Sequence, residues 1–136
     1  MKMFLGEYSP NITDGSRVAL PKKMREQLSG DFVIVARGFE KCVHVYDISD
    51  WSTQAQKQID NQGHTEKISD LERYIFTSAE QVSIDTQGRI VLPQALKDYA
   101  DIKKGLAVIG VGERIEVWDK NTWQEYKNKI SAKLSE

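Results

Sequence analysis

The sequence is poor in cysteine and histidine, and this scarcity excludes several kinds of site. Its single cysteine, Cys42, cannot form an internal disulfide, and no set of Cys and His residues at zinc-like spacing surrounds it. His44 alternates with apolar strand positions and is expected to face solvent or a neighbouring strand, whereas His64 lies in a breaker-rich loop. Neither histidine has a companion Cys or His at ligand spacing, so no metal site is expected.

Long apolar runs are also missing. No stretch approaches the roughly 18 uncharged apolar residues that a membrane span needs. The apolar segment 3–5 near the N-terminus is too brief for the core of a signal peptide. We therefore expect a cytoplasmic protein with no membrane partner.

The motifs of the common enzyme classes are absent as well. The sequence contains no Gly-rich phosphate loop, no nucleophile elbow, no His-Glu-x-x-His and no cysteine with a suitable partner base. Asp47 and Asp119 end matching strands and are expected to cap the helices that follow. We therefore expect no catalytic activity, no small-molecule substrate and no cofactor.

The chain has no basic surplus, although most DNA-binding proteins have one. Its net charge is −1 over 136 residues, whereas the release of counterions from DNA phosphates favours binding by basic proteins. The charge is uneven, however, because the segment 17–25 holds four basic residues and no acid. Since salt screens charges beyond about 10 Å, this local basic segment can act within a nearly neutral chain.

What the sequence does contain is an internal duplication. The segment Arg17-Val-Ala-Leu-Pro21 aligns with Arg89-Ile-Val-Leu-Pro93 at an offset of 72 residues, the difference between positions 17 and 89. Without a gap, the same offset pairs 43–47 with 115–119, Trp51 with Trp123, and Gly38 with Gly110. Two copies are too few for a solenoid, so we expect them to complete a common core as an intramolecular pseudo-dimer.

Each copy is predicted to fold as two strands joined by a turn, a short helix, a hairpin and a longer helix. In the first copy the strands are expected at 4–12 and 17–20, the short helix at 22–28, the hairpin at 32–36 and 42–47, and the longer helix at 51–60 with a break at 61–63. In the second copy they are expected at 81–84, 89–92, 94–100, 106–118 and 121–134. A helix at 65–74 has no counterpart and is the predicted connector. Short strands with helices at hairpin ends favour an α+β, barrel-like body.

Three segments carry a resemblance to a known family. They are Phe4-Leu-Gly-Glu-Tyr8, Asp85-Thr-Gln-Gly-Arg89-Ile-Val-Leu-Pro93 and Val117-Trp-Asp-Lys-Asn-Thr-Trp123. Together they resemble the MraZ family of bacterial transcriptional regulators over nearly the whole chain. The resemblance implies a duplicated AbrB-like (SpoVT-AbrB type) swapped-hairpin β-barrel with flanking helices and a pseudo-twofold axis within the chain. Residues 1–51 are then the first repeat, 52–75 a helical connector, and 76–136 the second repeat with the C-terminal helix, all in one compact body.

The resemblance also implies a function and its residues. Chains of this family close into rings that bind short direct repeats in the promoter of the division and cell-wall gene cluster. This chain is then expected to be nucleoid-associated, to bind double-stranded promoter DNA and to repress its own promoter. The Asp-x-x-x-Arg turn is the family's DNA-contacting motif, which assigns that role to Arg89, with Asp85 and Gly88 shaping the loop. In the first copy the role extends to Arg17, but Thr13 and Ser16 replace the acid and the glycine, so Arg17 is expected to be presented differently.

Arginine-bearing hairpins suit DNA on physical grounds. A two-stranded β-ribbon fits the major groove, and one guanidinium can bind guanine O6 and N7 together, for about 1–3 kcal/mol of discrimination. Two hairpins alone would bind weakly, whereas a ring that presents several can raise the affinity ~10²–10⁴-fold. Lys22, Lys23 and Arg25 follow the first hairpin and are expected to contact phosphates. Trp51 and Trp123 are expected to pack in the core or between subunits rather than to stack on bases.

An antitoxin-like interaction module of the same fold is the alternative function. Such a protein binds DNA through its barrel and a toxin through a disordered tail, and it normally carries one copy and dimerises. This chain carries both copies and has only residues 132–136 as a short tail. The regulator is therefore the favoured interpretation.

Overall fold

The computed structural model describes residues 2–62 and 67–135, and the five helices and antiparallel strands within them confirm the predicted α+β class. The first copy contains β1 (Glu7–Tyr8), β2 (Arg17–Ala19), α1 (Lys22–Arg25), β3 (Phe32–Arg37), β4 (Val43–Asp47) and α2 (Trp51–Gln62). The connecting helix is α3 (Ile68–Phe76). The second copy contains β5 (Glu80–Ser83), β6 (Arg89–Val91), α4 (Gln94–Tyr99), β7 (Leu106–Gly110), β8 (Ile115–Asp119) and α5 (Lys120–Leu134).

Several boundaries differ from the prediction, most clearly those of three elements in the first copy. The strand expected at 4–12 is reduced to β1 with single bridges on either side, because Gly6 has a φ of +92°, which interrupts a strand. The helix expected at 22–28 ends at Arg25, since the N–H groups of Gln27 and Leu28 bond to carbonyls three residues back in a tighter turn. α2 continues to Gln62, beyond the expected end at residue 60. Residues 63–66, with His64, the predicted breaker Gly63 and the predicted helix start Thr65, lie outside the described residues.

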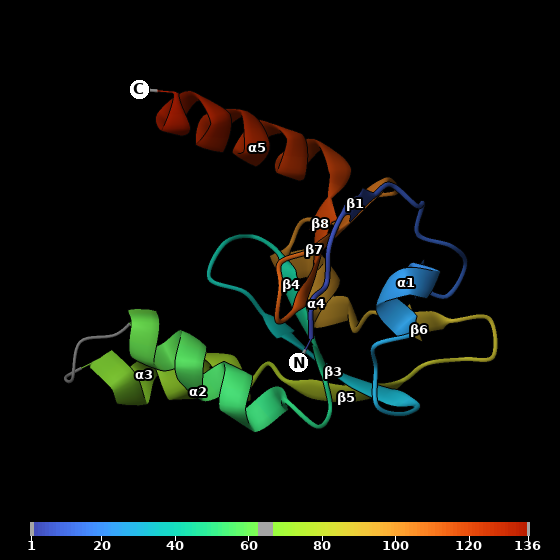
Figure 1. Ribbon diagram of the computed structural model, residues 1–136, viewed down its shortest axis with the longest axis horizontal. Coiled ribbons are helices and arrows are strands. Elements are labelled where there is room, and N and C mark those ends of the chain that lie inside the picture. Colours follow the sequence, from blue (N-terminus) through green and yellow to red (C-terminus); the bar gives the residue numbers. More distant parts are fainter. Residues whose placement is uncertain (1, 63–66, 136) are drawn as a thin grey trace.

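The two copies exchange strands in a six-stranded antiparallel sheet of order β1-β7-β8-β4-β3-β5 (Figure 1). β1 of the first copy pairs with β7 of the second, and β5 of the second copy pairs with β3 of the first. The hairpins β3–β4 and β7–β8 meet where β4 pairs with β8, and there His44 lies opposite Glu116. These two positions are related by the 72-residue offset, so a pseudo-twofold axis passes between them. The predicted duplication is thus visible as symmetry within one sheet.

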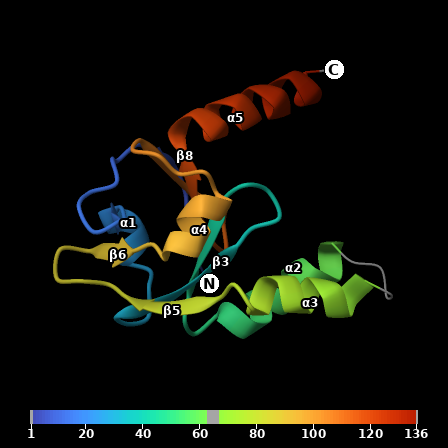
Figure 2. The same cartoon turned by 180° about the vertical axis from the view of Figure 1, so that it is seen from behind.

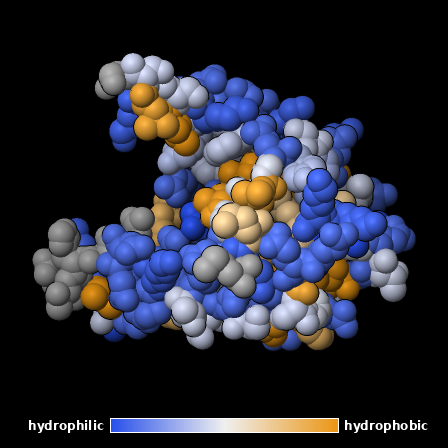
Figure 3. All heavy atoms as spheres, viewed as in Figure 1, coloured by the Kyte–Doolittle hydropathy of each residue, from blue (hydrophilic) through white to orange (hydrophobic). Residues whose placement is uncertain are grey.

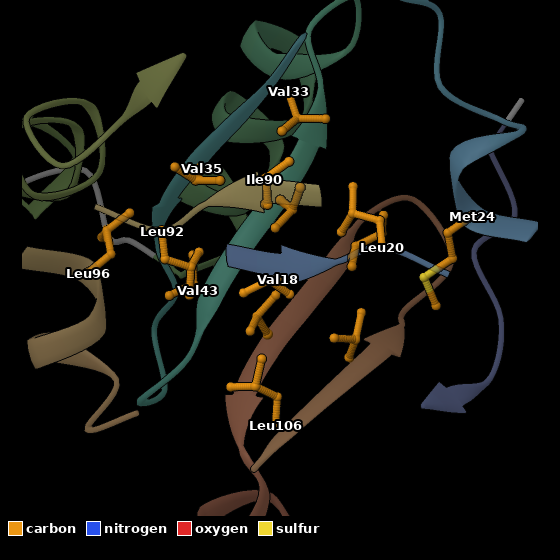
Figure 4. Close-up of a cluster of buried hydrophobic side chains, with 14 of the residues drawn as sticks. Val18, Leu20, Met24, Val33, Val35, Val43, Ile90, Leu92, Leu96 and Leu106 are labelled. Atoms are coloured by element: carbon orange, nitrogen blue, oxygen red, sulfur yellow. The ribbon is translucent and has the colours of Figure 1, made fainter. Parts of the chain in front are cut away.

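A separate two-stranded ribbon covers one face of this sheet. β2 and β6 pair antiparallel with Val18 opposite Ile90, so this ribbon also joins the two copies. The main core lies between ribbon and sheet, and Figure 4 shows its side chains converging from both copies. The labelled residues are Val18, Leu20, Met24, Val33, Val35, Val43, Ile90, Leu92, Leu96 and Leu106. Alternation along each strand explains this core, because every second side chain of a strand points to the same face.

Helices cover parts of the opposite face of the sheet. Trp51 of α2 packs on Tyr46, and the equivalent Trp123 of α5 packs on Trp118, both with ring centroids 5.2 Å apart. The predicted packing role of both tryptophans is confirmed. Figures 1 and 2 show α2 and α3 side by side at one end of the molecule, α1 and β6 at the other, and α5 projecting from the body. The residues of α2, α3 and their neighbours form a small separate cluster of their own around Ile59.

The two aspartates expected to cap helices behave differently. Asp119 caps α5 as predicted, because its carboxylate accepts from the N–H groups of Asn121 and Thr122. The carboxylate of Asp47 accepts mainly from elsewhere: from the backbone N–H and hydroxyl of Ser29 at 2.9 and 2.6 Å, and from Lys2 Nζ at 2.8 Å. Asp47 therefore ties the N-terminal segment and the end of the α1 turn to β4, which corrects the predicted capping role.

The surface combines hydrophilic and apolar areas. Figure 3 shows an apolar patch near the centre of the visible face and apolar side chains on the side of α5 that faces the body. Among the described helices, none combines the length and the apolar character needed to cross a membrane.

Candidate nucleic-acid interface

Arg17 and Arg89 lie on the same outer face of the β2–β6 ribbon. Arg17 is opposite Val91 and Arg89 is opposite Ala19, while the central pair, Val18 and Ile90, is buried. Directly opposed residues of an antiparallel pair point to the same face, so both arginines lie opposite to the core, diagonally across the pseudo-twofold axis. The structure therefore brings the two predicted arginines, 72 positions apart, onto one small surface.

In the second copy, Asp85 holds both the turn and the side chain of Arg89. Its Oδ1 accepts from the backbone N–H groups of Gln87 and Arg89, each at 2.9 Å, and its Oδ2 accepts from Arg89 Nε at 2.9 Å. The hydrogen bond from the Arg89 backbone N–H, aided by its guanidinium, holds the pKa of Asp85 below its ordinary value. The bond uses Nε, and within residues 2–62 and 67–135 the two terminal nitrogens of Arg89 have no hydrogen-bond partner. Arg89 is thus held in place, and its two terminal nitrogens remain available to donate hydrogen bonds to another molecule.

The turn requires Gly88. This residue has a φ of +78°, and a Cβ there would come within 2.4 Å of Arg25 Nε. The N–H of Gly88 closes the turn by donating to the Asp85 carbonyl at 2.9 Å, and its carbonyl accepts from Leu20 across the ribbon at 3.0 Å. The geometry is consistent with the turn-shaping role that was predicted for Asp85 and Gly88.

In the first copy the turn is closed differently. Thr13 and Arg17 exchange two backbone hydrogen bonds, and Ser16 adopts a φ of +59°, the left-handed conformation of its counterpart Gly88. Arg17 donates from the terminal nitrogen Nη1 to the carbonyl of Asp14 at 2.8 Å, and its guanidinium lies over Gly15. As expected from the rearranged turn, Arg17 is presented differently from Arg89, with part of its donor fork already bonded to the protein.

The three basic residues of α1 have different environments. Lys22 and Lys23 are exposed, whereas Arg25 is half-buried and donates from Nε to the carbonyl of Leu20 at 3.0 Å. The side chain of Arg25 packs over Gly88, so it supports the turn of the other copy. Contact with phosphate by these residues stays a prediction, and Arg25 has in addition a structural role that its sequence position did not suggest.

Lys97 was missed by the sequence reasoning and belongs to the same surface. It is the counterpart of Arg25 at the 72-residue offset, and its Nζ donates to the hydroxyl of Ser16 at 2.8 Å. Each copy therefore places a basic side chain on the turn of the other copy. The signal that could have found Lys97 was the repeat itself.

Comparison with known proteins agrees with the duplication. The model of the family described as "MraZ protein, putative antitoxin-like" matches residues 3–71 and again residues 75–136. A relative from Finegoldia magna is 39% identical over 129 residues, which cover 95% of this chain and 90% of the relative. Relatives from Clostridium acetobutylicum and Clostridium tetani are 37% and 34% identical, each with 98% of both chains covered. All three carry the name "Transcriptional regulator MraZ".

Proposed function

This chain belongs to the MraZ family, and from that premise we propose that it is a sequence-specific DNA-binding regulator of transcription. One observation carries the proposal: the strand exchange places Arg17 and Arg89 on the same outer face of one β-ribbon. The names of its relatives supply the regulatory part of the proposal.

The ribbon has the properties of a major-groove reader. The major groove of B-DNA admits a two-stranded β-ribbon, and a guanidinium reads guanine through its paired donors. Asp85 engages Arg89 through Nε and leaves both terminal nitrogens for such a pair. Because the side chain is already held in one position, less conformational entropy is lost on binding. We therefore assign the larger share of base recognition to Arg89 and a smaller share to Arg17.

The exposed lysines supply the sequence-independent part of binding. Lys22 and Lys23 lie at the start of α1, two residues after the end of β2, and their side chains are exposed. At this distance from the ribbon they can contact the phosphates that flank a groove and so fix the position of the protein on DNA. Arg25 joins them through the part of its guanidinium that the Leu20 carbonyl does not engage.

The finer features of the function follow from the resemblance and are part of the proposal. Several chains close into a ring, and the ring binds short direct repeats in the promoter of the division and cell-wall genes and represses its own transcription in the nucleoid. The strand exchange supports a swapped-hairpin barrel of the AbrB-like type, with repeats at 1–51 and 76–136 and a connector at 52–75. A ring explains how a chain of net charge −1 binds DNA, because several arginine ribbons act together.

Fluorescence anisotropy with a labelled fragment from upstream of the gene tests the proposal. Arg89→Ala is expected to weaken binding by about 5–150-fold, the equivalent of 1–3 kcal/mol, and Arg17→Ala by less. Arg73→Ala removes an exposed arginine of α3 and serves as the matched control, which should bind like the wild type. If the folded double variant Arg17→Ala/Arg89→Ala keeps wild-type affinity, the ribbon is not the DNA-binding surface. Light scattering of the same samples should give a mass several times 15.5 kDa.

A further inference from the structure

The outer face of the β2–β6 ribbon carries apolar side chains as well as arginines. In each strand a half-buried arginine is followed by a buried residue and then by an exposed apolar one, which is Ala19 in β2 and Val91 in β6. Residues two apart on a strand share a face, so Ala19 and Val91 lie on the arginine face. Val91 keeps 46% of its surface exposed. Both copies thus place an uncovered methyl-bearing side chain beside the arginines.

This exposure departs from the usual alternation of a strand. When one face of an antiparallel sheet packs on the core, the other face is normally polar. A single exposed valine needs no explanation, but here apolar residues occupy equivalent positions of both copies, 72 residues apart. The core packs against the other face of the ribbon, through Val18 and Ile90 (Figure 4), so it does not account for Ala19 and Val91.

Each arginine has one of these apolar side chains directly across the ribbon. Arg17 lies opposite Val91, and Arg89 lies opposite Ala19, so each pair joins the two copies. Directly opposed side chains of an antiparallel pair have their Cβ atoms about 4.5–5.5 Å apart. Successive bases of one DNA strand are about 3.4 Å apart along the helix axis. An arginine and its apolar partner therefore reach the same base pair or adjacent base pairs.

Thymine offers the chemistry that an apolar side chain recognises in the major groove. Of the four standard bases, only thymine presents a methyl group there, and alanine is among the side chains that contact it. Guanine presents the paired acceptors O6 and N7 to a guanidinium. We propose that Ala19 and Val91 contact the methyl groups of thymines that adjoin the guanines bound by the arginines. This inference rests on the proposed DNA-binding function and adds a second kind of base recognition to it.

The two pairs divide recognition differently. Val91 has two terminal methyl groups, whereas Ala19 has one, so Val91 buries more apolar surface against a thymine methyl group. Val91 faces Arg17, the arginine to which we assign the smaller share of base recognition, and Ala19 faces Arg89. The thymine contact therefore contributes more to specificity in the Arg17–Val91 pair than in the Arg89–Ala19 pair.

Replacement of thymine by uracil in the DNA tests the contact, because uracil pairs with adenine in the same way and lacks only the methyl group. The labelled fragment from upstream of the gene is prepared with thymine or with uracil throughout and titrated by fluorescence anisotropy. The wild type should bind the uracil fragment at least about fourfold more weakly, the equivalent of one buried methyl-sized group. A third fragment, with 7-deazaguanine in place of guanine, lacks the N7 acceptor and tests the arginine contact separately.

Variants of the ribbon locate the effect. Val91→Ser removes the apolar contact at an exposed position, so the ratio of the affinities for the thymine and uracil fragments should fall by about fourfold. Ala19→Ser should lower this ratio by less. Val111→Ser is the matched control, because it changes a valine of similar exposure, 40%, just after the end of β7 and outside the ribbon. This variant should keep the wild-type ratio.

The outcomes separate this inference from the proposed function. Equal affinity of the wild type for the thymine and uracil fragments overturns the inference, whether or not the variants fold. A wild-type ratio in both ribbon variants also overturns it, since the loss then comes from the DNA itself. In both cases, weaker binding of the 7-deazaguanine fragment would still support recognition of guanine by the arginines. Absence of binding to all three fragments overturns the inference and the proposed function together.

Discussion

Arg17 and Arg89 are engaged through different nitrogen atoms. Arg89 uses Nε toward Asp85, whereas Arg17 uses Nη1 toward the carbonyl of Asp14. A bidentate pair with guanine needs two donors on one edge of the guanidinium: the bond of Arg89 leaves its Nη1–Nη2 edge, and the bond of Arg17 leaves its Nε–Nη2 edge. While these bonds are kept, the two arginines can meet a base only through different edges. The difference between the copies therefore comes from which nitrogen the turn uses.

At the residue scale, the contacts of Asp47 lead to a prediction about the stability of the protein at low pH. Burial opposes its ionisation, but hydrogen bonds from Lys2 and Ser29 outweigh burial and hold its pKa below the ordinary value of 3.8. Its contribution to stability is therefore complete above pH 3.8 and is lost as the pH falls through the lower pKa of the folded state.

Replacement by asparagine removes this contribution. Asp47→Asn should lower the free energy of unfolding at neutral pH by about 1–3 kcal/mol, because Ser29 and Lys2 lose a charged acceptor. It should also flatten the pH dependence of stability below about pH 4. Urea unfolding at several pH values measures both effects. Asp50→Asn is the control, since Asp50 is more exposed and lies farther from Lys2, at 3.2 Å; an equal loss in this variant would contradict the assignment.

At the residue scale, the sequence predicts which residues belong to the site better than it predicts which residues they contact. The repeat identified Arg17 and Arg89, the family resemblance added Asp85 and Gly88, and the structure places all four at the ribbon and its turns. Arg25 bonds to Leu20 of its own copy but packs over Gly88 of the other copy, and the separation along the chain contains no information about the second contact. For the same reason the sequence does not decide whether His44 faces solvent or a neighbouring strand.

The turn between β5 and β6 provides a prediction at the element scale. Gly88→Ala must adopt a left-handed conformation, which costs about 1–2 kcal/mol, and must also displace the side chain of Arg25. We expect the free energy of unfolding to fall by at least that amount and DNA binding to weaken. Gly30→Ala is the matched control, because a Cβ there meets nothing within 4 Å and its stability should change by less than ~1 kcal/mol. Equal losses in both variants, measured by urea unfolding, would contradict this account of the turn.

Most elements could be predicted, because the strands alternate and the helices begin after clear turn residues. The first segment is the instructive exception. Phe4, Glu7, Tyr8 and Asn11 all make bridges or pairs with the β7–β8 hairpin or with Gly105, so the segment follows β7 over its length. Gly6 breaks it into pieces because its backbone is left-handed. Apolar content reveals that such a segment is extended, but it does not reveal where pairing is interrupted.

The interleaved copies provide a prediction for the whole molecule. β1, β5 and the β2–β6 ribbon each join the two copies, so neither half has a complete sheet or core alone. We expect one cooperative unfolding transition, with the same midpoint by tryptophan fluorescence and by far-UV circular dichroism.

Equivalent core variants provide the matched test. Leu20→Ala and Leu92→Ala occupy corresponding buried positions in the two copies, and each should destabilise the whole protein by about 2–5 kcal/mol. Both probes should shift together in both variants. Separate transitions for the fluorescence and the dichroism signals would show that the copies fold independently.

At this scale, the duplication, the α+β class and a core shared by the two copies could be predicted from the sequence, but the pairing of individual strands could not. A constant offset of 72 residues does not say that β1 pairs with β7 or β5 with β3. Which strands pair depends on the free energy of the complete core rather than on any local pattern.

The pairing of β1 with β7 has a consequence for synthesis on the ribosome. β1 starts at Glu7 and its partner ends at Gly110, so the first strand has no edge to join until most of the chain has been translated. Contacts of such high sequence separation slow folding, and an extended segment without a partner is exposed to proteases and to other nascent chains during that time. The charged and glycine-containing composition of Leu5-Gly-Glu-Tyr8 reduces the risk that this waiting segment aggregates.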